Sequence, residues 1–211
     1  MEQPKVLCVD WDGTLSYSRF WENCDDTTLD PTAIGHLTTF LFRDSQALVQ
    51  DWMKGFVSSA TVVDILAQQF NLSSQALYQE LERSCRAMQF ADSSIPAKLT
   101  RIRDQGVKVV IATDNMDTFT KWTVPSLELE LLFDGVLSSP DRGAFKKEVA
   151  DGRSPFFDLY LNQQGLKPGE AVLLDDNPKN AVVESLNMRF VHITPTNPLC
   201  KVLDSFIAAT D

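Results

Sequence analysis

Short, mostly apolar runs recur along the chain, and the strongest of them end at polar residues. Runs of this kind are typical of strands buried on both faces of a parallel sheet. The three strongest runs are Val6–Val9, Val107–Ala112 and Ala171–Leu174. They end at Asp10, at Thr113 and at the pair Asp175 and Asp176. Weaker candidates are Gly135–Ser138 and Arg189–Ile193. Polar side chains are therefore predicted at the carboxyl ends of several strands.

Between and after these runs the hydrophobic period is that of helices. Ser154 and Pro155 read as the N-cap and first residue of a helix that ends at Gly165. Its expected apolar face is formed by Phe156, Leu159 and Tyr160. Asn177 and Pro178 give the same start signal for a second helix, whose expected face is formed by Val182, Val183 and Leu186. Alternating strands and helices predict an α/β fold with a Rossmann-like, doubly wound parallel sheet, in which ligands bind beyond the carboxyl ends of the strands.

Residues 16–96 interrupt this alternation, because strand-like runs stop and helical spacings replace them. Three helical faces are expected in this segment: Ile34, Leu37 and Leu41; Val62, Ile65, Leu66 and Phe70; Leu77, Leu81, Cys85 and Met88. The sequence therefore predicts a core built from residues 1–15 and 97–211, with residues 16–96 inserted as a helical subdomain. The hinges of this insert are expected near Leu15 and Pro96.

Composition and charge limit the functions that such a chain can have. With 211 residues, 44% of them hydrophobic, the chain can bury a substantial core. The net charge of -10 and the absence of any Lys/Arg-rich run argue against nucleic acid as a partner. The apolar run before Asp10 is too short for a signal peptide or a membrane span, so no membrane partner and a cytoplasmic location are expected.

The acidic balance also constrains the substrate. An anionic substrate would be repelled at long range, and would need a local positive centre such as a divalent cation or a well-placed lysine. The four cysteines, Cys8, Cys24, Cys85 and Cys200, are scattered and predict neither a zinc site nor a disulfide framework. His36 and His192, the two histidines, belong to no visible metal or acid–base cluster.

The strongest chemical signal is Asp10-Trp11-Asp12-Gly13-Thr14, directly after the first predicted strand. Two carboxylates separated by one residue can converge on one cation, and Gly13 permits a tight turn directly after them. An ordinary Asp-rich turn after a strand would have the same composition. The residues at the ends of the other strands therefore decide between the two interpretations.

Together these residues resemble the haloacid dehalogenase (HAD) superfamily, whose members carry four short motifs in a fixed order. Asp10 to Thr14 matches the first motif, D-x-D-G-T, at every defined position. Val109-Val110-Ile111-Ala112-Thr113, followed by Asp114 and Asn115, matches the second, an apolar strand that ends in Thr or Ser. Val172-Leu173-Leu174-Asp175-Asp176 matches the fourth, an apolar strand that ends in paired acids.

The third motif of the superfamily is a lysine. Phe133 to Ser139 resembles the segment that precedes it, and Lys146 lies at the expected distance beyond that segment. Lys147 is the next choice and Arg153 a more distant one, because Glu148 to Arg153 intervene here before Pro155, whereas many relatives place a proline almost directly after the lysine.

The resemblance implies a Mg²⁺-dependent phosphatase that acts on a small phosphorylated molecule through an aspartyl phosphate. Asp10 would be the nucleophile and Asp12 the acid–base group. Thr113, Asp114, Asn115 and Lys146 would bind the phosphoryl group, and Thr113 and Lys146 would also take part in catalysis. The metal ligands would be Asp10, Asp12 through its main-chain carbonyl, Asp175 and Asp176, with Asp176 as the direct ligand of the pair. The segment 16–96 would be a cap.

Alternatives remain open within this interpretation. Asp12 speaks against halide displacement, because dehalogenases of the superfamily generally lack this second acid. A phosphomutase of the hexose-phosphate type would use the same core and the same cap position, and a non-catalytic binding protein could retain the fold. The arginines and lysines of the insert, Arg19, Arg43, Lys54, Arg83 and Arg86, are interpreted as solvated surface charges. The sequence predicts neither the substrate nor the oligomeric state.

Overall fold

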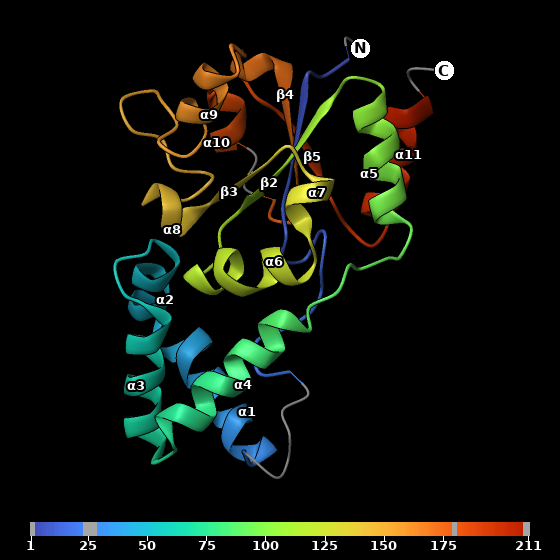
Figure 1. Ribbon diagram of the computed structural model, residues 1–211. Helices are drawn as coiled ribbons and strands as arrows, with labels where there is room; N and C mark the ends of the chain where they lie inside the picture. The colour runs from blue at the N-terminus through green and yellow to red at the C-terminus, as the bar shows by residue number, and fades with distance from the viewer. Residues whose placement is uncertain (1–2, 23–28, 179–180, 209–211) are drawn as a thin grey trace.

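The computed structural model describes residues 3–22, 29–178 and 181–208 of the chain. Its centre is a parallel sheet of five strands in the order β3-β2-β1-β4-β5 (Figure 1). The strands are β1 (Val6–Val9), β2 (Lys108–Thr113), β3 (Gly135–Ser138), β4 (Ala171–Asp175) and β5 (Arg189–His192). The predicted α/β fold with a doubly wound parallel sheet is confirmed, and strand limits differ from those predicted by at most one residue at either end.

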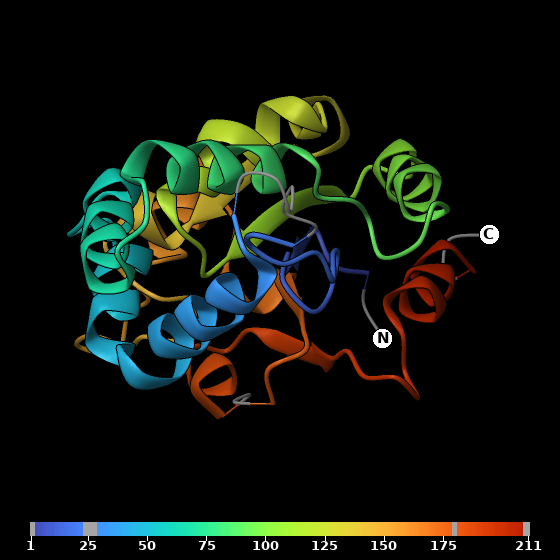
Figure 2. The same ribbon diagram turned by 90° about the horizontal axis from the view of Figure 1, so that it is seen from below.

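Helices cover both faces of the sheet, and successive strand residues point to opposite faces. Leu7 and Val9 of β1 face a cluster that contains α5 (Ile95–Asp104) and α11 (Leu199–Ala208). Val6 and Cys8 face a second cluster that contains α9 (Asp158–Gln163) and α10 (Ala181–Ser185). Seen from below, α5 and α11 lie side by side at one end of the molecule (Figure 2). The central strands are thereby buried on both faces.

The two helices predicted after the lysine region differ in detail from the structure. The hydroxyl of Ser154 accepts a hydrogen bond from the Phe157 amide at 3.0 Å, but regular α9 begins only at Asp158. Phe156 and Tyr160 are buried as predicted, but Leu159 is 55% exposed and Leu161 is buried in its place. For the second helix, Val183 and Leu186 are buried as expected. Its predicted start crosses residues 179–180, which lie outside the described residues.

The inserted segment forms α1 (Pro31–Thr39), a π-helical turn (Phe40–Asp44), α2 (Gln46–Met53), α3 (Ser59–Phe70) and α4 (Ser74–Arg86). Three of these helices begin with a side-chain cap that satisfies a free backbone amide: Asp30 accepts from Thr32, Ser58 from Thr61, and Ser73 from Ala76. The predicted apolar faces hold except at Ile65, which is 40% exposed, while Val63 and Ala67 are buried in its place. We call α1 to α4 the inserted helices.

The inserted helices lie together at the edge of the sheet where the strands end (Figure 1). After β2 the chain forms a π-helical turn (Phe119–Thr123), which contacts α4, and then α6 (Val124–Ser126) and α7 (Leu129–Leu132), the second of which contacts α5. Two short elements complete the chain, α8 (Ser139–Arg142) after β3 and a 3₁₀ turn (Pro168–Glu170) before β4. In the described ranges, no helix is long and apolar enough to cross a membrane.

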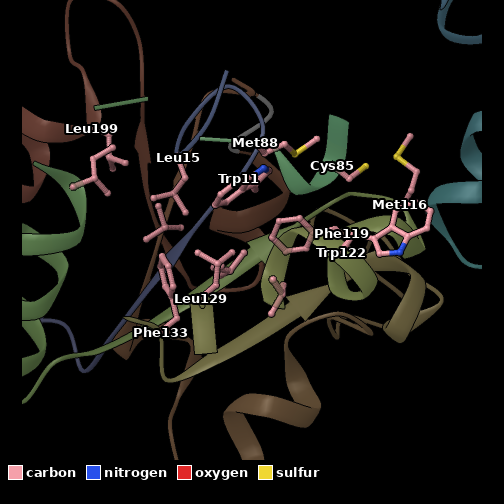
Figure 3. Packing of buried hydrophobic residues seen from close by; sticks show 14 of the residues in the cluster. Trp11, Leu15, Cys85, Met88, Met116, Phe119, Trp122, Leu129, Phe133 and Leu199 are labelled. Atoms are coloured by element: carbon pink, nitrogen blue, oxygen red, sulfur yellow. The ribbon is translucent and has the colours of Figure 1, made fainter. Parts of the chain in front are cut away.

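Apolar and polar contacts join the inserted helices to the sheet domain. Trp11 packs against Phe119 with ring centroids 5.2 Å apart, close to Cys85 and Met88 of the insert (Figure 3). A polar contact lies further along the same boundary. There Asp117 accepts hydrogen bonds from the Trp52 indole at 2.9 Å and from the Ser59 amide and hydroxyl. The packing of the inserted helices against the sheet domain therefore depends on particular side chains from both sides.

Candidate active site

The strand register brings the predicted site residues to one edge of the sheet. Val9 lies level with Ile111 of β2 and with Leu174 of β4. Asp10, the next residue, donates its amide to Leu174 O at 2.9 Å and therefore lies beside Asp175. Thr113 ends β2 on the other side. Polar residues at the ends of three adjacent strands are thus placed within one residue of the same level.

Lys146 joins two of these carboxylates. Its ammonium nitrogen lies 2.6 Å from Asp10 Oδ1 and 2.8 Å from Asp175 Oδ2, and its side chain is only 4% exposed. The Lys146 amide donates to Asp114 Oδ1 at 2.8 Å, which holds the loop of the lysine against the end of β2. A buried cation with two anionic partners is expected to be rigidly held, because separating them would leave buried charges unpaired.

Lys147 lies on the far side of Asp175 and does not contact Asp10. Its ammonium nitrogen is 3.2 Å from Asp175 Oδ1, donates to Asn177 O at 2.6 Å and lies over the Phe190 ring. Asp175 Oδ1 also accepts the Asn177 amide at 2.7 Å. Asp175 Oδ1 therefore accepts two hydrogen bonds, whereas Oδ2 forms an ion pair with Lys146 and accepts no hydrogen bond from the described residues. Arg153, the third candidate for the motif lysine, forms a backbone bridge with Ala150 instead and lines a cavity beside α9.

Asp176 is exposed and lies against the turn of the first motif. Gly13 has φ +75°, and a Cβ atom there would lie 2.6 Å from the Asp176 Cγ. Glycine is therefore required at this position both by the backbone conformation and by the approach of the carboxylate. One oxygen each of Asp10, Asp175 and Asp176 can be chosen so that all three lie within 4.8 Å of one another. These three acids form the candidate metal centre.

Two hydroxyls near this centre are buried without a partner. Thr113 Oγ1 and Thr14 Oγ1 make no hydrogen bond within the described residues. A buried hydroxyl without a partner costs stability, so its presence indicates a ligand or water that the site accommodates. Asn115 is different, because its side-chain oxygen accepts the Met116 main-chain amide at 2.9 Å and its own main-chain N–H donates to the Ser139 hydroxyl at 3.0 Å. The Asn115 side chain serves the local turn.

The charges around the site leave room for a divalent cation. Four carboxylates (Asp10, Asp114, Asp175, Asp176) surround two ammonium groups (Lys146, Lys147), which leaves an excess of two negative charges when all are ionised. Burial, only partly offset by the Lys146 ammonium, raises the pKa of Asp10 to about 7. Although burial opposes ionisation of Asp175, the two lysines lower its pKa. A site with only oxygen ligands and an excess of negative charge fits Mg²⁺.

The Asp12 carboxylate is not one of the three that form the candidate metal centre. Its carboxylate pairs with the Arg19 guanidinium, and the two side chains are 56% and 60% exposed. Arg19 is thus an exposed surface charge, as predicted, and it also contacts the first motif. The other four cations of that group pair with acids as well: Arg43 with Asp44, Lys54 with Glu148, Arg83 with Glu80 and Arg86 with Glu82.

Sequence reasoning missed two further residues around the site. His192 Nε2 lies 2.9 Å from the Asp176 carbonyl, so β5 supports the acidic loop. Asp117, four residues after Thr113, accepts the hydrogen bonds that tie α2 and α3 to the sheet domain. The position of Asp117 just after the second motif was the only signal for its role in the sequence. Its hydrogen-bond partners could not be predicted, because they lie 58 and 65 residues away in the sequence.

Comparison with known proteins identifies the fold. No protein-family model matches the chain, and no curated protein sequence is detectably similar to it. Among solved structures, a HAD family enzyme of Bacteroides thetaiotaomicron in complex with magnesium and inorganic phosphate matches with a TM-score of 0.64 and 15% identity, over 90% of this chain and 94% of that chain.

Two other structures match over similar lengths. A protein of Porphyromonas gingivalis, described as a predicted HAD-like family hydrolase, has a TM-score of 0.66 and 19% identity, over 90% of this chain and 91% of that chain. The L-2-haloacid dehalogenase of Xanthobacter autotrophicus has a TM-score of 0.66 and 13% identity, over 96% of this chain and 88% of that chain. The chain therefore has the fold of HAD-family enzymes, and this fold hosts more than one chemistry.

Proposed function

We propose that this protein is a Mg²⁺-dependent phosphatase of the HAD superfamily, which hydrolyses a small phosphorylated molecule through an aspartyl phosphate on Asp10. The observation that carries the proposal is the set of groups at the ends of β1, β2 and β4. Lys146 lies between Asp10 and Asp175, Asp176 lies within reach of both acids, and Thr113 offers an unpaired buried hydroxyl. A nucleophile, a cation and a donor for phosphoryl oxygens are thus gathered around one point.

Asp10 is suited to attack phosphorus. Its Oδ1 accepts the Trp11 amide at 2.7 Å and faces Lys146 at 2.6 Å, which fixes the carboxylate plane. No hydrogen bond from the described residues reaches Oδ2, so this oxygen is available to the substrate. Attack by Asp10 forms an oxygen–phosphorus bond and breaks the bond to the leaving oxygen. Lys146 balances the negative charge near the nucleophile and the phosphoryl oxygens, and Thr113 can donate to one of them.

Asp12 is the group that we assign to proton transfer. A poor alkoxide leaving group needs a proton as it departs, and the water that hydrolyses the aspartyl phosphate needs a base. Asp12 follows the nucleophile by two residues and is half-exposed, so its carboxylate can turn toward the leaving oxygen. This second acid favours phosphate transfer over halide displacement, in which the leaving group needs no proton.

The metal would be held by Asp10 and Asp176, with the Asp12 main-chain carbonyl and Asp175 completing the set. When bound, Mg²⁺ supplies the positive charge that lets the nucleophile and the phosphate approach each other. Asp176 is favoured as the direct ligand over Asp175, because both oxygens of Asp175 already contact Lys146, Lys147 or the Asn177 amide. Asp175 then acts mainly by orienting the two lysines.

The inserted helices are proposed to act as a cap. They lie over the edge of the sheet at which the site is built (Figure 1), and a cover of this kind excludes bulky protein surfaces and water. The proposed substrate is therefore a small molecule. A phosphomutase remains the second candidate, since it would use the same acids and a cap in the same place.

A substrate screen tests the proposal. The purified protein would be offered phosphorylated metabolites, an aryl phosphate and a 2-haloacid, each with Mg²⁺ and with a chelator. We expect release of inorganic phosphate only with Mg²⁺, and no release of halide. Halide release without phosphate release would refute the phosphatase assignment. Interconversion of sugar phosphates after priming with a bisphosphate would favour the mutase.

A further inference from the structure

The two stretches of chain that connect the inserted helices to the sheet domain run side by side. Ala91 N donates to Leu15 O at 2.8 Å, and the Ser16 hydroxyl donates to Gln89 O at 2.6 Å. The Gln89 main-chain N–H in turn donates to the Ser18 hydroxyl at 3.1 Å. These hydrogen bonds hold the two connectors together close to the first motif. A molecule bound between the connectors would therefore lie near the proposed catalytic residues.

An open cavity of about 400 Å³ lies between these connectors. Its lining includes Tyr17, Arg19 and Glu22 from the connector that follows β1, Ser84 from α4, and Gln89 and Phe90 from the connector that follows α4. Pockets of this size accommodate small molecules. Arg19 lines the cavity and also contacts Asp12. The cavity therefore lies next to the residue that we propose as the proton donor to the leaving oxygen.

Arg19 is the cation among the described residues that line this cavity. Its pair with Asp12 is between two side chains that are more than half exposed, and such pairs contribute little to stability. A guanidinium carries five N–H donors in a planar fork that matches a carboxylate or a phosphate. Arg19 can therefore bind an incoming anion without the cost of breaking a strong contact.

Glu22 is the acidic residue of the same lining, and it would oppose an anion. Its Oε2 accepts the Arg19 amide at 2.9 Å, so its carboxylate is held at the backbone of the connector. The chain as a whole carries a net charge of -10 and repels anions at long range. A specific anion site therefore needs a local cation, and Arg19 is placed to provide it.

Resting on the proposed phosphatase function, we propose that Arg19 determines specificity by binding a second anionic group, a carboxylate or a phosphate, on the leaving part of the substrate. The phosphoryl group would lie at Asp10, the scissile oxygen near Asp12, and the second anion in the cavity at Arg19. Esters with an anionic leaving group are then preferred over neutral ones of the same length.

A matched series of three-carbon phosphate esters tests this assignment. The substrates are 3-phosphonooxypropanoate, 3-hydroxypropyl phosphate and 3-aminopropyl phosphate, and propane-1,3-diol bisphosphate distinguishes phosphate from carboxylate as the second anion. For the wild-type protein, kcat/KM should be about tenfold higher for an anionic ester than for the neutral one, as expected for a hydrogen bond between charged groups at a partly exposed site.

Substitutions distinguish a specific role of Arg19 in binding the second anion from general effects of losing a positive charge. Arg19→Ala should abolish the preference for the anionic ester, while Glu22→Gln should increase it by removing a negative charge from the same cavity. Arg43→Ala is the matched control, because Arg43 is an exposed arginine of the insert that pairs with its neighbour Asp44. It should leave the preference unchanged. The ratio of the two kcat/KM values cancels any effect of Arg19 on turnover that is common to both esters.

The possible failures are distinguishable. If the protein hydrolyses an aryl phosphate and the neutral ester but shows no preference, or prefers the amino ester, the assignment of Arg19 is refuted and the phosphatase function stands. Retention of the preference in Arg19→Ala would also refute the assignment. Absence of phosphatase activity with every ester would overturn both proposals.

Discussion

Replacing Gly13 by alanine should separate the fold of the first motif from its function. Gly13 has φ +75°, where an L side chain is strained, and its Cβ would lie 2.6 Å from the Asp176 Cγ. The backbone strain should lower the free energy of unfolding by about 1 to 2 kcal/mol. For a chain of this size that loss corresponds to a fall in Tm of roughly 2 to 8 °C.

The contact with Asp176 adds a second, larger effect on metal binding. The carboxylate can move away because it is exposed, so the contact costs little stability. It must then leave the position in which its oxygen lies within 4.8 Å of those of Asp10 and Asp175. Displacing a metal ligand or its support typically weakens metal binding about 10- to 100-fold. A tenfold loss of affinity reduces the stabilisation by saturating Mg²⁺ by about 1.4 kcal/mol.

Gly106→Ala provides the matched control. Gly106 has φ +84°, lies between α5 and β2, and has no atom within 4 Å of the position of a Cβ. Both variants should therefore lose similar stability in thermal unfolding without metal. Calorimetric titration should show near wild-type Mg²⁺ affinity for Gly106→Ala and at least tenfold weaker binding for Gly13→Ala. Equal Mg²⁺ affinity in the two variants would refute the role given to Asp176.

Other substitutions test the remaining parts of the site. Asp176→Asn should weaken Mg²⁺ binding more than Asp175→Asn in titration calorimetry, because both oxygens of Asp175 already contact protein groups; the reverse order would exchange their roles. Lys146→Met should lower kcat by about 100-fold or more, since the cation beside the nucleophile is lost, whereas Lys147→Met should lower it less than tenfold; equal losses in steady-state kinetics would contradict this. Asp117→Ala should lower the free energy of unfolding in urea by about 1 to 3 kcal/mol, because its donors in α2 and α3 lose their acceptor. An unchanged urea midpoint would show that Asp117 does not dock the inserted helices.

The sheet and the edge that carries the site were predictable because their signals are local. Buried parallel strands are short apolar runs, and the polar residue that ends each run marks its carboxyl end. Asp10, Thr113 and Asp175 could therefore be placed at one edge from the sequence alone. Errors occurred where a helix has apolar residues on more than one side. At Leu159 and Ile65 the neighbouring elements, rather than the helical period, determine which residue is buried.

The choice between adjacent residues and the long-range polar contacts could not be predicted. Lys146 and Lys147 are neighbours in the chain, and only the fold of their loop decides which one faces Asp10. The pair of Arg19 with Asp12 depends on the path of a connector that has no regular secondary structure. The partners of Asp117 belong to helices that precede it by more than fifty residues. None of these contacts has a periodic signature.

The most direct test of the proposed mechanism is covalent labelling of Asp10. The protein and its Asp10→Asn and Asp12→Asn variants would be mixed with an aryl phosphate carrying labelled phosphorus and with Mg²⁺, then quenched in acid and digested for peptide mapping. Asp10→Asn lacks the nucleophile and should carry no label. Asp12→Asn retains the nucleophile, and an aryl leaving group hardly needs a proton, so label should accumulate because hydrolysis lacks its base. Label on Asp10 that is stronger in Asp12→Asn than in the wild-type protein is the predicted result. Label on any other side chain, or equal loss of label in both variants, would contradict the proposed mechanism.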